Sequence, residues 1–150
     1  MCYDAVMSRV SDEELAAEWH DLMGRYHRAI CTLDRELLAN HRISASDFEV
    51  LQQLYRATAS RSMRLSELGD KVHLTQSALS RLIARLERDG LVERCMCPDD
   101  RRSVIAAITP EGVARYRQAK PTQRAVLREQ AVVLTPYEVR KAPVARASRT

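Results

Sequence analysis

The chain has 150 residues, of which 45% are hydrophobic and 5% aromatic, and its formal net charge is +4. This length suggests one domain, or one lobe with attached helices, and the low aromatic content argues against an all-β fold. A secretion signal is unexpected because Asp4 and the acidic cluster that starts at Asp12 interrupt the N-terminus, and no apolar stretch is long enough to cross a membrane. We therefore expect a cytoplasmic protein.

The charge is unevenly distributed along the chain. Residues 1–60 carry 6 basic and 10 acidic side chains, whereas residues 61–150 carry 18 basic and 10 acidic side chains. Of the 24 basic residues, 21 are arginine, whose planar guanidinium suits phosphates and base edges. A compositional bias of the whole genome would give the same arginine excess. The basic C-terminal part is the candidate for contact with nucleic acid.

The first predicted helix begins at Ser11, which forms a capping box with Glu14. Apolar residues then recur at intervals of three, four and seven, which predicts a helix to about Asn40. Such a helix is longer than one lobe needs for cover, so we expect it to pack partly on its own lobe and partly on a partner chain. The alternative is a helix that only lies across one lobe. The apolar positions are Leu15, Trp19, Leu22, Tyr26, Leu33 and Leu37.

A second capping box, formed by Ser46 and Glu49, predicts the start of the next helix. Residues 58–63 read as a polar loop. The buried side of this helix is expected at Phe48, Leu51, Leu54 and Tyr55.

Residues 65–90 have the pattern of a helix-turn-helix. A short helix is marked by Leu65, Leu68 and Val72, and Gly69 stands where two crossing helices leave no room for a side chain. His73 occupies the turn position that often holds glycine. Thr75 is predicted to cap a second helix, which Gly90 ends as a left-handed residue. This second helix is expected to bury Leu79, Leu82, Ile83 and Leu86 and to expose Ser77, Ser80, Arg81, Arg85 and Arg88.

Two strands and a further helix are predicted after the helix-turn-helix. Residues 91–94 and 104–108 read as the strands of a hairpin whose loop holds Pro98, two aspartates and two arginines, and a hairpin in this place is a wing. Thr109 and Pro110 then read as the cap and first residue of a helix. Pro121 is expected to kink or interrupt this helix near Lys120 before the helical pattern resumes over residues 125–134.

Four motifs in order resemble the MarR family (multiple antibiotic resistance regulators) of winged-helix transcription factors. They are LSEL at 65–68, DGLV at 89–92, DRR at 100–102 and TPEG at 109–112, and the resemblance covers roughly residues 11–134. It implies a mainly α fold with a small β-wing. Dimerisation helices are implied at 11–41 and 110–140, a winged-helix DNA-binding lobe at 46–108, and a disordered tail at 141–150. Thr135 begins a short last helix that Pro143 ends, so we expect the other helices to hold the dimer.

The resemblance also implies a function. It indicates a homodimer that binds a palindromic site in double-stranded DNA, acting as a repressor that a small-molecule effector releases. In the family, the aspartate matching Asp100 holds one wing arginine by an ion pair, and an arginine of this pair enters the minor groove; our choice for that residue is Arg102. The predicted DNA-binding residues are Thr75, Gln76, Ser77, Ser80, Arg81, Arg85, Asp100, Arg101 and Arg102. Candidates for the effector pocket, chosen by residue type alone, are Trp19, Leu22, Met23, Tyr26 and Phe48, although each is more simply an ordinary core residue.

Other classes of function find little support. The four histidines lie in no recognisable nucleophile motif, and no glycine-rich phosphate loop is present, so we expect neither an enzyme nor a cofactor. Cys95 and Cys97 do not have zinc-knuckle spacing, so no metal is expected. Two alternatives stay open: a redox-responsive regulator that uses a cysteine, and a winged helix that contacts proteins instead of DNA. For Cys31, in an apolar stretch, the simpler expectation is a small hydrophobe.

Overall fold

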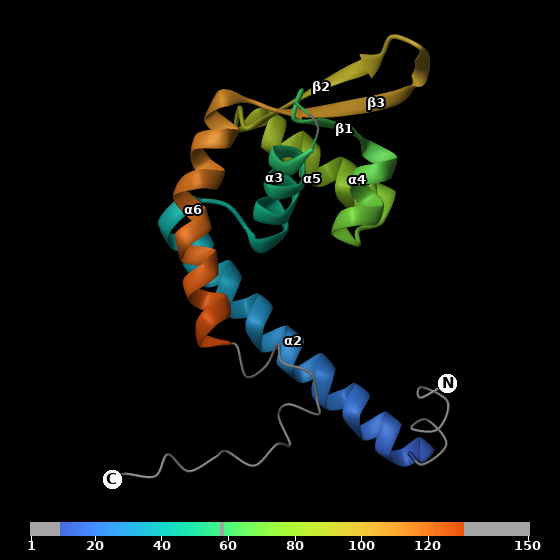
Figure 1. Ribbon diagram of the computed structural model, residues 1–150, viewed down its shortest axis with the longest axis vertical. Helices are drawn as coiled ribbons and strands as arrows, with labels where there is room; N and C mark the ends of the chain where they lie inside the picture. The colour runs from blue at the N-terminus through green and yellow to red at the C-terminus, as the bar shows by residue number, and fades with distance from the viewer. Residues whose placement is uncertain (1–9, 58, 131–150) are drawn as a thin grey trace.

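The computed structural model describes residues 10–57 and 59–130, which form a mainly helical fold with a small antiparallel sheet (Figure 1). This agrees with the predicted fold class. In this part of the chain the elements are α2 (Asp12–His41), α3 (Ala45–Arg56), β1 (Ser62–Arg64), α4 (Leu65–Val72), α5 (Gln76–Arg88), β2 (Val92–Cys97), β3 (Asp100–Ile108) and α6 (Pro110–Glu129). The predicted last helix and the tail at 141–150 lie outside the described residues. No helix that the structure describes is long and apolar enough to span a membrane.

Helix α2 begins and ends close to where the sequence predicts. The Ser11 hydroxyl accepts a hydrogen bond from the Glu14 amide at 3.3 Å, and the Glu14 carboxylate accepts one from the Ser11 amide at 2.8 Å. At the other end, Arg42 adopts a left-handed conformation with φ of 58°. Figure 1 shows the N-terminal half of α2 extending away from the other helices, while its C-terminal half runs beside α6.

The prediction of where α3 begins was wrong by two residues. Ser44, not Ser46, caps the helix, and Asp47, not Glu49, completes the capping box. Both pairs have the same spacing, but only the earlier one places Ile43 directly before the cap, where it can pack with Phe48 one turn on as a hydrophobic staple. Ile43 and Phe48 are both 1% exposed and belong to the same core cluster.

Part of the predicted loop at 58–63 is a strand. β1 pairs with β3, with Met63 opposite Ala106, and the sheet order is β1-β3-β2. The two wing strands are also longer than the predicted 91–94 and 104–108, because pairing extends to Cys97 opposite Asp100 through a bulge after Met96. An edge strand of three residues is too short to show the alternation of apolar and polar residues that predicts a strand. Residues 62–64 are therefore identified as a strand only by their pairing with β3.

Helix α6 continues past Pro121, so of the two predicted outcomes, a kink or an interruption near Lys120, the interruption was wrong. Two hydrogen bonds to His41, at the end of α2, hold α6 on both sides of the proline. Arg115 Nη1 donates to the His41 carbonyl oxygen at 3.0 Å, and the Thr122 hydroxyl lies 2.7 Å from His41 Nε2. The tertiary contacts therefore compensate for the one backbone hydrogen bond that proline removes.

The core lies among α3, α4, α5 and the sheet, and α2 and α6 close it on one side. The rings of Phe48 and Tyr116 pack with centroids 5.4 Å apart, and those of Tyr55 and Tyr116 with centroids 4.7 Å apart. All four apolar residues that the sequence assigns to the buried side of α5 are in this core. The opposite side of α5 is therefore fixed toward solvent.

Candidate nucleic-acid interface

Helix α5 presents a polar surface made of short side chains and arginines. The Thr75 hydroxyl caps the helix by accepting a hydrogen bond from the Ala78 amide at 3.3 Å. Gly90, with φ of 75°, follows the last turn in the left-handed conformation predicted for it. Because the apolar residues of α5 are buried on one side, the residues predicted to contact DNA lie on its exposed side, which we call the reading surface. They are Gln76, Ser77, Ser80, Arg81 and Arg85.

The turn between α4 and α5 brings the two helices into close contact. His73 adopts φ of 55°, the conformation that glycine often supplies at this place, and the Leu74 amide donates to the Gly69 carbonyl oxygen at 3.2 Å. A Cβ on Gly69 would lie 2.7 Å from Gln76 Nε2. The absence of a side chain at Gly69 therefore leaves space for the Gln76 amide at the start of the reading surface.

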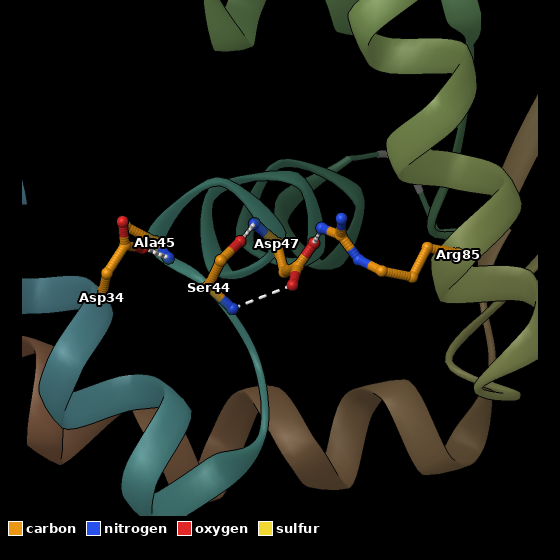
Figure 2. Close-up of polar contacts among 5 residues, drawn as sticks. All are labelled: Asp34, Ser44, Ala45, Asp47 and Arg85. Atoms are coloured by element: carbon orange, nitrogen blue, oxygen red, sulfur yellow. Dashed lines mark hydrogen bonds and ion pairs between the residues drawn. The ribbon is translucent and has the colours of Figure 1, made fainter.

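The two central arginines of this surface have different surroundings. Arg81 is exposed, and no hydrogen bond or ion pair joins it to another residue in the described ranges. Arg85 forms an ion pair with Asp47 at the start of α3, drawn in Figure 2. The sequence prediction did not include Asp47, because this partner is 38 residues away and belongs to another helix.

The wing loop is organised by Asp100. Its carboxylate accepts hydrogen bonds from the Ser103 hydroxyl at 2.7 Å and from the Arg102 backbone amide at 3.0 Å. These two bonds, with the nearby Arg64 guanidinium, hold the pKa of Asp100 below its ordinary value. Among the described contacts of Asp100, the family's ion pair to a wing arginine is absent, so the loop is fixed through a backbone amide and a hydroxyl instead. The side chains of Arg101 and Arg102 are exposed.

A hollow of about 270 Å³ joins the wing to the start of α5, the candidate recognition helix. Arg102 and Gln76, both predicted DNA-binding residues, line it together with Arg64 and Ser66. Arg64 also donates a hydrogen bond to Ser103 at 3.4 Å. Arg64 and Ser66 were not among the residues predicted from the sequence, although both lie at the LSEL motif, and a basic residue and a hydroxyl at a helix start are types that often contact phosphate.

The predicted pocket residues separate into two groups. Tyr26 and Phe48 line a cavity of about 290 Å³ between α2, α3 and the α4–α5 turn. Trp19, Leu22 and Met23 do not line it; they lie on the exposed N-terminal half of α2, where Trp19 is 63% exposed. The polar residues of the cavity wall were missed, since nothing in their spacing marks them. They are Ser46, Glu49, Lys71, His73 and Gln123.

The cysteines are placed differently from one another. Cys31 is exposed, with its sulfur 3.6 Å from His27 Nε2, so the expectation of a packed small hydrophobe was wrong. In the wing, Cys95 is exposed and Cys97 is buried. Within the described ranges, no three histidine, cysteine or acidic side chains gather as a metal-binding group would require.

Comparison with known proteins agrees with this geometry. The MarR family profile matches residues 43–104. YsmB, an uncharacterised HTH-type transcriptional regulator of Bacillus subtilis, is 32% identical over 105 residues, which are 70% of each chain. Sco3205, a MarR family transcriptional regulator from Streptomyces coelicolor whose crystal structure is in complex with DNA, is 28% identical. It superposes with a TM-score of 0.76 over 88% of this chain and 81% of that chain.

A second structure with DNA gives the same result. A MarR variant from E. coli, complexed with operator DNA, is 26% identical and superposes with a TM-score of 0.70 over 87% of this chain and 91% of that chain. The chain belongs to the MarR family of transcriptional regulators.

Proposed function

We propose that this regulator binds a palindromic site in double-stranded DNA as a homodimer, and represses transcription until a small molecule releases it. The observation that carries the proposal is the exposed face of α5, where short polar side chains and Arg81 stand beside a wing with two exposed arginines. Short polar residues and arginine can reach the base edges of a major groove without steric conflict. Two relatives with the same fold, Sco3205 and E. coli MarR, have structures in complex with DNA.

The roles of the residues follow from their places. α5 enters the major groove, so that Gln76, Ser77, Ser80 and Arg81 contact bases and phosphates while Thr75 caps the helix. The wing reaches a minor groove with Arg102, and Asp100 sets the shape of the loop. Arg64 and Ser66, at the hollow beside Gln76, contact the phosphate backbone between these two elements.

The exposed apolar stripe on α2 supports a homodimer. Leu15, Trp19, Leu22, Met23 and Tyr26 are all large, apolar and between 44% and 63% exposed. At 100° per residue they fall within about 100° of arc on one side of the helix. A contiguous apolar stripe of this kind marks an interaction surface. In a symmetric dimer, the two recognition helices would stand about one turn of DNA apart.

The cavity beneath α2 is the proposed effector site. Its wall is formed by apolar residues of α2 and α3, by Lys71 in the last turn of α4 and by His73 in the α4–α5 turn. An amphipathic compound, with a ring among the apolar residues and an acidic or hydroxyl group toward Lys71, suits this lining. A ligand there would contact both the long helix and the turn that precedes the recognition helix, so it would favour one spacing of the two recognition helices.

The proposal is tested by selecting duplexes from a random pool with the full chain, then measuring affinity for the selected duplex and for an unrelated one. Expected results are a palindromic selected site and a steep fall of affinity with salt, since each neutralised phosphate contributes to the slope. A winged helix used for protein contacts would select no site. A thermal-shift screen of phenolic and other amphipathic compounds, followed by DNA release, tests the effector.

A further inference from the structure

Asp47 carries a buried carboxylate that is shared between two helices. Its Oδ2 atom accepts a hydrogen bond from the Ser44 amide at 2.8 Å, and the Ser44 hydroxyl accepts one from the Asp47 amide at 3.0 Å (Figure 2). The other oxygen, Oδ1, is paired with Arg85 Nη2 on the recognition helix. Asp47 is only 4% exposed. Both carboxylate oxygens are therefore engaged, each with a donor from a different element.

The pair is unequal in exposure. A buried carboxylate is costly unless a cation and hydrogen bonds compensate for lost hydration, and Arg85 supplies that charge. The Arg85 side chain itself stays 47% exposed. Only its Nη2 is bonded to Asp47, and its Nε and Nη1 atoms have no protein partner among the described residues. Arg85 is thus held at one nitrogen while its remaining donors face solvent on the side of α5 that we assign to DNA.

A second carboxylate connects this pair to the long helix. Asp34, on α2, accepts a hydrogen bond at Oδ1 from the Ala45 amide at 2.7 Å, in the first turn of α3 (Figure 2). The start of α3 is therefore fixed to α2 by Asp34 and to α5 by Asp47. This junction is short, because only residues 42–44 separate α2 from α3.

We infer that Asp47 is a positioning residue for DNA recognition: it orients Arg85 and ties the recognition helix to the junction between α2 and α3. The inference rests on the proposed DNA-binding function and adds a residue that lies outside the DNA-binding surface. It also provides a direct route by which a movement of α2, where the proposed dimer and effector contacts lie, reaches the recognition helix. Networks of packed side chains, hydrogen bonds and ion pairs of this kind can carry energetic coupling between separate sites.

The chemistry of the pair predicts which substitution is informative. Asparagine at position 47 keeps the shape and one acceptor, but its amide NH₂ must face either the Ser44 amide or the Arg85 guanidinium, both of which are donors. Asp47→Asn also makes the protein more positive, and by long-range electrostatics alone that change would strengthen DNA binding. If Asp47 positions Arg85, Asp47→Asn should instead weaken DNA binding. The direction of the change in affinity therefore separates positioning from long-range electrostatics.

The experiment measures affinity for a duplex selected by the wild-type chain from a random pool, with wild type, Asp47→Asn, Arg85→Gln and the double variant. We expect each single variant to weaken binding roughly tenfold, the size of one charge-assisted hydrogen bond. The double variant should bind no more weakly than Arg85→Gln, because both changes remove the same contact. Affinity for an unrelated duplex should fall less in Asp47→Asn than affinity for the selected one.

Two controls separate positioning from folding. Asp12→Asn makes the same charge change on the exposed first turn of α2 and should bind at least as tightly as wild type. Ser44→Ala weakens the cap of α3 but leaves the carboxylate beside Arg85, so it should lower the thermal midpoint and leave DNA affinity nearly intact. If Asp47→Asn does not fold, Arg85→Lys replaces it. The lysine ammonium has no planar fork that could contact Asp47 and DNA at the same time, so the Arg85→Lys variant should bind DNA several-fold more weakly than wild type.

Asp47→Asn binding as tightly as wild type or more tightly, or additive losses in the double variant, would overturn the inference. So would an Arg85→Lys variant with wild-type affinity. A wild-type chain that selects no duplex would contradict the proposed function itself, which is a different result.

Discussion

A Cβ atom on Gly112 would lie 2.1 Å from the backbone carbonyl oxygen of Leu91, the residue that follows Gly90 at the end of the recognition helix. The first turn of α6 therefore packs so closely on this segment that position 112 has no room for a side chain. Thr109 strengthens the same contact. Its hydroxyl donates to the Gly90 carbonyl oxygen at 2.6 Å, and its amide donates to the Leu91 carbonyl oxygen at 3.1 Å. The wing and the recognition helix are therefore anchored at their base to α6.

Gly112→Ala is expected to destabilise the protein, because the clash is with backbone that cannot rotate away. We expect a loss of about 2 kcal/mol, within the range of overpacked sites, and a fall of roughly 5 °C in the thermal midpoint. Gly24→Ala is the matched control. A Cβ there meets only the end of the Arg28 side chain, so alanine should leave the midpoint unchanged or raise it. Equal midpoints for the two variants would mean that the contact at Leu91 relaxes easily.

Arg81→Ala should weaken binding to the selected duplex by roughly 1–3 kcal/mol, the usual size of a base-reading arginine. The reason is that Arg81 is exposed at the centre of the α5 surface and makes no ion pair with the described residues. Fluorescence anisotropy at physiological salt measures the change. The control is Arg35→Ala, which removes the same charge from α2, where Glu36 is the one ion-pair partner of Arg35 among the described residues. Unchanged affinity in Arg81→Ala would remove it from the reading surface.

The two wing arginines should differ in their effect on DNA binding. Arg102→Ala is expected to lower both affinity and the salt slope, by about one unit in the slope if one phosphate contact is lost. Its side chain lines the hollow that leads to Gln76, and Asp100 fixes its backbone amide. Arg101→Ala should have the smaller effect. Titrations of both variants at several salt concentrations check this, and the wing is not a DNA element if neither variant differs from wild type.

The stripe on α2 can be tested by placing a charge in it. Trp19→Glu should dissociate the dimer at micromolar concentration, since the carboxylate would be buried against an apolar partner surface. Arg28→Ala, on the opposite side of the same helix, should remain dimeric. Sedimentation velocity distinguishes the two states. Should Trp19→Glu keep the mass of wild type, the dimer interface lies elsewhere.

The recognition helix and its ends could be predicted from the sequence because local rules determine them. The spacing of three and four residues between Leu79, Leu82, Ile83 and Leu86 determines the buried side of the helix. Thr75 caps its start, and Gly90 tolerates the left-handed conformation that ends it. The reading surface is then simply the side that remains. The capping box at Ser11 is local in the same way.

Features that depend on distant contacts could not be predicted. The continuation of α6 through Pro121 depends on hydrogen bonds to His41, and β1 depends on its pairing with β3. The choice between two capping boxes with equal spacing was settled by the burial of Ile43. Arg85 was assigned to DNA from its helical position, and its pairing with Asp47 becomes visible only when α3 and α5 pack together.

If two copies of this chain bind one palindromic duplex through α5, sedimentation of the full chain with the selected duplex should give a single complex of two chains per duplex. This complex should be lost at high salt, and it should also be lost when either half-site is scrambled. A complex of one chain per duplex, or one that survives scrambling of a half-site unchanged, would rule out this mode of binding.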